Sequence, residues 1–149
     1  MPSGESERRI VVGVDGSDSS KAALAWAVKQ ARYTGAAVEA VTAWEFGLTY
    51  GFPPSAAFDV DYAGIAADVV ADAVAGVSSP GEPVKIRSVV AEGHAAQVLL
   101  DASEGAELLV VGSRGRGGFT GALLGSTSQH CAQHATCPIM VIHGSVTRS

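Results

Sequence analysis

Residues 9–15 read R-I-V-V-G-V-D and are followed directly by Gly16 and Ser17. The run is apolar and β-branched at successive positions, which predicts a strand that is buried on both faces. Ser17 is suited to cap a helix whose apolar residues recur with helical spacing, and Gly35 is suited to end that helix. A buried strand that runs straight into an amphipathic helix is typical of a parallel α/β sheet.

The same alternation continues to the C-terminus. Further strands are predicted at 37–43, 84–91, 107–111 and 138–142, and further helices at 59–77, 95–102 and 126–134. Strands that alternate with helices predict the α/β class, with one doubly wound, five-stranded parallel sheet and helices on both faces. In such sheets ligands bind beyond the carboxyl ends of the strands, where the strand order reverses. The loops after the first and fourth strands are therefore the first candidates for a site.

Length and composition predict one domain. The chain has 149 residues, of which 47% are hydrophobic and 17% charged. We expect the domain at 9–143, a flexible tail at 1–8 and a second tail at 144–149. The stretch 44–58 contains Gly, Pro and several aromatic residues and is predicted to be a long loop, which packs locally or covers a ligand.

The charge balance limits the partners. Fifteen acidic residues against ten basic ones give a net charge of −5, which disfavours nucleic-acid and anionic-membrane partners. The N-terminal segment has no apolar signal core, and no apolar run reaches the length of a membrane span. We therefore expect a cytoplasmic protein, whose Cys131 and Cys137 stay as thiols.

A glycine-rich loop follows the fourth strand. Residues 112–128 read G-S-R-G-R-G-G-F-T-G-A-L-L-G-S-T-S. Glycines that open a helix let backbone N–H groups approach anionic oxygens, so the loop is a candidate phosphate cradle. It is not a Walker A loop, because no Lys precedes Ser126, and the dinucleotide fingerprint fails because its third glycine position is Thr120.

The spacing Gly112-x2-Gly115-x9-Gly125-Ser126 resembles the ATP-binding motif of the universal stress protein family. The resemblance covers about residues 9–143. It includes the blocks IVVGVDGSDSS, AEGHAAQVLLDAS, LLVVGSRGRGGF, LLGSTSQH and CPIMVI, which occur in this order.

This resemblance implies a sheet of order 3-2-1-4-5, a homodimer paired through its last strand, and ATP bound together with Mg²⁺. It implies a ribose contact at one carboxylate, an adenine contact at the end of the second strand and phosphate contacts along the glycine loop. The implied ATP-binding residues are Asp15, Gly16, Ala43, Val111, Gly112, Ser113, Arg114, Gly115, Gly125, Ser126, Thr127 and Ser128. The implied dimer contact comprises Pro138, Ile139, Met140, Val141 and Ile142.

Simpler roles stand beside these. The glycine loop could be a structural turn, and Asp15 could serve to cap the first helix. Arg114 and Arg116 could each neutralise phosphate or be solvated. His94 is expected to start a helix.

His130, Cys131, His134 and Cys137 resemble metal ligands in type. Because Pro138 disfavours helix at Cys137, that thiol is expected to leave the shared face. We therefore predict no dedicated protein metal site.

The sequence thus predicts a dimeric, ATP-binding regulatory protein that acts in a stress response through nucleotide occupancy. No catalytic residue is predicted, because no base and no loop Lys accompanies Gly125 and Ser126 and phosphoryl transfer needs such groups. The alternatives are a nucleotide-independent dimeric interaction protein and a weak ATPase or autophosphorylating enzyme.

Overall fold

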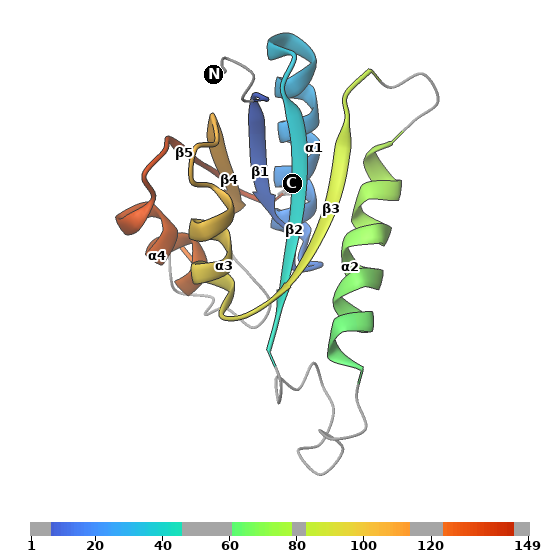
Figure 1. Ribbon diagram of the computed structural model, residues 1–149, viewed down its shortest axis with the longest axis vertical. Coiled ribbons are helices and arrows are strands. Elements are labelled where there is room, and N and C mark those ends of the chain that lie inside the picture. The colour runs from blue at the N-terminus through green and yellow to red at the C-terminus, as the bar shows by residue number, and fades with distance from the viewer. Residues whose placement is uncertain (1–6, 46–60, 79–82, 114–123, 145–149) are drawn as a thin grey trace, which may run out of the picture.

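The computed structural model describes residues 7–45, 61–78, 83–113 and 124–144 (Figure 1). They form a five-stranded sheet in the order β3-β2-β1-β4-β5, and every pair of neighbouring strands is parallel. The predicted fold class and strand order are therefore confirmed. The elements are β1 (Arg9–Gly13), α1 (Asp18–Thr34), β2 (Ala37–Trp44), α2 (Tyr62–Val77), β3 (Ile86–Glu92), α3 (Ala95–Ala102), β4 (Leu108–Gly112), α4 (Ser126–His134) and β5 (Ile139–Ile142).

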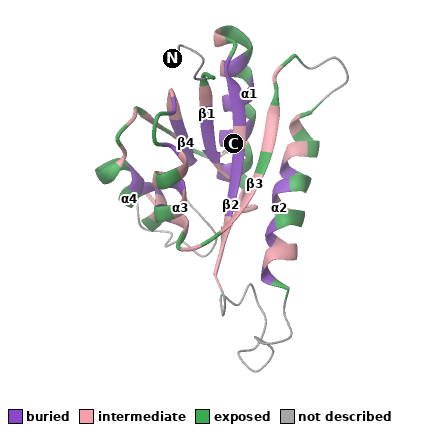
Figure 2. Cartoon of the chain, in the orientation of Figure 1, coloured by how far each residue is buried: buried purple, intermediate pink, exposed green. Residues whose placement is uncertain are grey.

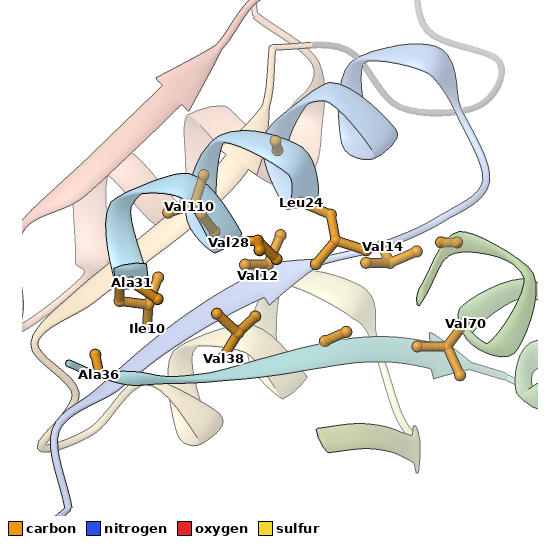
Figure 3. Close-up of a cluster of buried hydrophobic side chains, with 14 residues drawn as sticks. Ile10, Val12, Val14, Leu24, Val28, Ala31, Ala36, Val38, Val70 and Val110 are labelled. Carbon is orange, nitrogen blue, oxygen red and sulfur yellow. The ribbon is translucent and has the colours of Figure 1, made fainter. Parts of the chain in front are cut away.

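The helices cover both faces of the sheet. On one face, Ile10 and Val12 of β1 pack with Leu24 and Val28 of α1 (Figure 3), in a cluster that also includes Val70 of α2. On the other face, a second apolar cluster gathers residues of β1, β2 and β4 under α3 and α4. Figure 2 shows the central strands β1, β2 and β4 as mostly buried. Burial on both faces explains why these strands read as continuous apolar runs.

The first helix begins and ends at the predicted residues. The Ser17 side chain accepts a hydrogen bond from the backbone N–H of Ser20, which is the usual N-cap arrangement. Gly35 follows the helix in the left-handed conformation, with φ 81°. An L side chain is disfavoured there, so glycine suits this position. Between these caps, α1 places its apolar stripe on the sheet.

The carboxyl ends of β1 and β2 are joined by a side-chain hydrogen bond. Buried Thr42 donates its hydroxyl to the carbonyl oxygen of Val14 at 2.8 Å, and the Val14 N–H donates to the carbonyl oxygen of Val41 at 2.8 Å. These bonds extend the strand pairing beyond Gly13, so the residues that follow β1 start from a fixed position.

Near the amino ends of the strands, charged side chains form a network. Arg9 pairs with Glu39 at 3.0 Å, and Arg87 pairs with both Glu39 at 3.1 Å and Glu7 at 2.6 Å. The ion pairs thereby join the amino-terminal parts of β1, β2 and β3.

No helix among the described residues is long and apolar enough to cross a membrane.

Candidate functional site

A pocket opens at the carboxyl ends of the strands, between the end of β1 and the start of α4. The strand order reverses here, because β2 and β4 lie on opposite sides of β1, and this is where doubly wound sheets bind ligands. The pocket is lined by Gly13, Val14, Asp15, Ser20, Val41, Ala43, Ala95, Leu99, Val111, Gly112, Thr127 and Ser128.

Asp15 is held by the turn that follows β1. Its Oδ1 accepts hydrogen bonds from the backbone N–H of Ser17 at 2.9 Å and from the Ser17 hydroxyl at 2.5 Å. Gly16 lies between them with φ 87°, a conformation that favours glycine. The capping alternative is thus observed in a modified form: Ser17 caps α1, and Asp15 fixes the turn before the cap. The carboxylate still borders the pocket.

Gly112 ends β4 against the first turn of α1. A Cβ atom at this position would lie 2.7 Å from the carbonyl carbon of Ser19 and 2.8 Å from the backbone nitrogen of Ser20. Backbone atoms at such distances cannot move aside cheaply, so only glycine fits. This packing requirement explains the glycine without a ligand, and the phosphate contact at Gly112 stays a prediction.

Hydrogen bonds join the end of β4 to the start of α4. The N–H of Ser113 donates to the Ile142 carbonyl at 2.8 Å, and the N–H of Gly125 donates to the Ser113 carbonyl at 2.6 Å. The buried Ser128 hydroxyl lies 3.2 Å from the Ser113 carbonyl oxygen and 3.1 Å from that of Gly125. Ser113 and Gly125, which flank the segment 114–123, are therefore held together beside the pocket.

The first turn of α4 offers backbone donors. Helix geometry leaves the N–H groups of residues 126–128 without an intrahelical acceptor. Pairing within the helix begins at Gln129, whose N–H donates to the Gly125 carbonyl at 2.9 Å. The N-cap Gly125 provides no side-chain cap. N–H groups without an intrahelical acceptor and the positive end of the helix dipole can bind an anion here.

The structure brings half of the predicted site residues to the pocket wall. They are Asp15, Ala43, Val111, Gly112, Thr127 and Ser128. Four others lie within two residues of these in the chain without lining the pocket: Gly16, Ser113, Gly125 and Ser126. Arg114 and Gly115 lie outside the described residues, as does most of the predicted loop 44–58.

Sequence reasoning missed the apolar wall. Val14, Val41 and Leu99 line the pocket although they belong to the buried core. An apolar residue that lines a pocket has the same sequence pattern as one that is buried in the core. Only the packing of α3 against β1 in the folded chain shows which of them line the pocket. Asp15 is the one charged residue on the wall among the described residues.

The two cysteines that resembled metal ligands in the sequence lie in the apolar core around α4. Cys131 of α4 is buried in the apolar cluster, and this burial raises the pKa of its thiol to about 11. Cys137 packs against the same apolar cluster. Across the described ranges, no group of three or more His, Cys, Asp or Glu residues could hold a metal ion. His94, as expected, precedes a helix, at the N-cap of α3.

The fold and the pocket define a class: α/β proteins with a doubly wound parallel sheet and a ligand pocket at the reversal of strand order. Within that class, the sequence model of one family, the universal stress protein family, matches residues 7–143. The chain belongs to the universal stress protein family.

Known proteins of this family align with most of the chain. Universal stress protein Rv2623 of Mycobacterium tuberculosis is 36% identical over 141 residues, which cover 93% of this chain and 46% of that protein. The chain thus spans about half the length of the curated relatives it matches.

Two solved structures have the same architecture. UspA of Lactobacillus plantarum has a TM-score of 0.74 at 25% identity, covering 91% of this chain and 97% of its own. A universal stress protein in complex with cAMP has a TM-score of 0.60 at 27% identity, covering 93% of this chain and 98% of its own.

Proposed function

We propose that this chain is an adenine-nucleotide-binding regulatory protein whose ligand is ATP with Mg²⁺. The observation that carries the proposal is the pocket itself. A carboxylate on a fixed turn, an apolar wall and the free N–H groups of a helix start lie around one opening. Those three features match the ribose, the base and the phosphates of a nucleotide.

The apolar wall suits the base. Val14, Val41 and Leu99 offer aliphatic surface, and Ala43 at the end of β2 has a backbone that could meet the polar edge of adenine. Asp15 has a carboxylate that can accept hydrogen bonds from ribose hydroxyls.

The phosphates would lie at the start of α4. The N–H groups of Ser126 and Thr127 are free of intrahelical acceptors, and anions bind at such helix starts. Arg114 and Gly115 are proposed to complete this end of the site from the segment outside the described residues. Mg²⁺ would be bound through the phosphates, because Mg²⁺ commonly uses substrate phosphates and water as ligands.

The cAMP-bound relative supports an adenine nucleotide as ligand, since it shares the fold at 27% identity. We propose ATP in place of a cyclic monophosphate because the spacing Gly112-x2-Gly115-x9-Gly125-Ser126 resembles the ATP-binding motif of the family. We further propose that the chain is a cytoplasmic homodimer that acts through occupancy of the site, with at most slow hydrolysis. The described pocket wall contains no His or Lys to serve as a base.

A calorimetric titration with Mg²⁺-ATP and Mg²⁺-GTP tests the proposal. We expect ATP to bind one site per chain with higher affinity than GTP, because no carboxylate other than that of Asp15 lines the described pocket to recognise guanine. Equal affinities would contradict the adenine assignment. Failure of both nucleotides to bind would favour a nucleotide-independent interaction protein.

A further inference from the structure

Two exposed histidines lie one turn apart on α4. The ring centroids of His130 and His134 are 4.5 Å apart, with an angle of 38° between the ring planes. Both side chains line a groove between α3 and α4, two helices that pack on each other (Figure 1). This groove shares no lining residue with the pocket at the carboxyl ends of the strands.

The opposite wall of the groove is acidic. It contains Asp101 and Glu104 near the end of α3, together with Gln97, whose amide donates to Asp101 Oδ1 at 2.9 Å. Within the described part of the chain, neither carboxylate forms an ion pair with a Lys or Arg, and no Lys or Arg lines the groove. Two carboxylates without a basic partner attract cations to this surface.

Contrary to the sequence-based expectation of no dedicated metal site, we propose that His130 and His134 chelate a divalent transition-metal ion in this groove. Imidazoles at i and i+4 lie on one face of a helix, and this spacing places two ring nitrogens on a single metal ion. Imidazole suits Zn²⁺, Cu²⁺ and Ni²⁺, whereas Mg²⁺ and Ca²⁺ prefer oxygen ligands.

The proposed site is open. No third His, Cys, Asp or Glu of the described residues completes a ligand group with these histidines, so water fills the remaining coordination positions. Asp101 and Glu104 contribute charge from across the groove. An open two-imidazole site releases its ion readily, unlike a closed four-ligand structural site.

The cysteines of this region are not part of the site. Cys131 lies between the histidines in sequence, but its side chain is fully buried, with its sulfur 3.9 Å from the carbonyl oxygen of Ala96 in α3. The two exposed imidazoles are therefore the ligands.

Titration of the tag-free chain with Ni²⁺ tests this inference. We expect one Ni²⁺ per chain and a rise in the midpoint temperature of unfolding, because the ion binds the folded helix. His130→Gln and His134→Gln should each weaken binding by about 100-fold, since the second ligand of a chelate acts at high effective concentration. The matched control is His94→Gln, which removes an exposed histidine outside the groove and should leave the affinity unchanged.

Two results would overturn the proposal. One is an affinity that neither groove substitution lowers. The other is a loss in Cys137→Ser equal to that in His134→Gln, which would assign the ion to the thiol. Circular dichroism of each variant checks that α4 is retained. The histidines are exposed, so these substitutions should not disturb folding. The ATP affinity of each variant should also be unchanged, because the groove and the nucleotide pocket share no residue.

Discussion

Gly112 has a role at the residue scale that is independent of any ligand. Because a Cβ atom would approach backbone atoms of Ser19 and Ser20 at 2.7 and 2.8 Å, Gly112→Ala should lower the free energy of unfolding by about 1–3 kcal/mol. Urea denaturation measures this. The matched control is Gly76→Ala in α2, where a Cβ atom meets nothing within 4 Å. There the helix preference for Ala should stabilise the protein by about 0.5–1 kcal/mol. Equal effects at the two glycines would contradict the packing account.

Asp15 is the residue at which turn formation and ligand binding can be separated. Asp15→Asn keeps an oxygen that accepts from the Ser17 N–H, so the turn should persist. The charge is lost, and hydrogen bonds to charged groups contribute about 1.5–3 kcal/mol. We therefore expect ATP affinity to fall by roughly 10- to 100-fold.

The control for this change is Asp18→Asn, which neutralises an exposed carboxylate in the first turn of α1. Its ATP affinity should match that of the unaltered chain. If both variants bind equally well, Asp15 has no part in the site. If Asp15→Asn alone unfolds in circular dichroism, the turn depends on the charge, and the proposed division of roles is wrong.

At the scale of elements, the junction of β4 and α4 depends on a buried hydroxyl. Ser128→Ala removes the donor near the Ser113 and Gly125 carbonyl oxygens. We expect a loss of about 1 kcal/mol in unfolding free energy, together with weaker ATP binding, because the helix start shifts. Ser126→Ala removes an exposed hydroxyl two residues earlier and should leave stability unchanged. Thermal unfolding measures the stability of both variants, and titration measures their ATP affinity. Equal stability of the two would contradict a stabilising role for the Ser128 hydroxyl.

Elements with local signals were predictable from sequence. The caps Ser17 and Gly35 lie where their residue types require, and α4 has the predicted bounds Ser126–His134. The start of α2 was less predictable: the helix begins at Tyr62 after the N-cap Asp61, not at residue 59. Asp59 and Asp61 are both suitable caps, so composition does not choose between them.

The site was predictable only in part, for a physical reason. Asp15 follows β1 and Gly112 ends β4, and the ends of these strands must meet in a doubly wound sheet, so the proximity of the two residues follows from topology. The steric demand at Gly112 and the wall formed by Leu99 arise from helices placed by tertiary packing. No pattern within one element encodes such contacts. The acidic wall of the histidine groove likewise comes from a separate helix, α3.

At the scale of the whole molecule, β5 is an edge strand, and no other strand of the described residues pairs with its outer side. Met140 on this strand is 38% exposed, and β5 contains no charge of the kind that protects edge strands. We predict a homodimer paired through β5. Met140→Lys should convert it to a monomer in sedimentation at micromolar concentration. Val141→Lys is a poorer test, because Val141 packs against the apolar cluster under α3 and α4.

Tyr33→Lys is the matched control, since Tyr33 is 76% exposed and lies on α1, away from β5 in the chain. It should leave the dimer intact. A chain that sediments as a monomer before any substitution would contradict the dimer. ATP binding should survive in Met140→Lys, because no residue of β5 lines the described pocket.

The central claim is that this pocket holds an adenine nucleotide, and a crystal structure of the chain grown with ATP and Mg²⁺ tests it most directly. The account predicts adenine beside Ala43, ribose hydroxyls within hydrogen-bond distance of Asp15, and phosphate oxygens at the backbone N–H groups of Ser126 and Thr127. Nucleotide density at another surface, or an empty pocket at an ATP concentration well above the measured Kd, would contradict it.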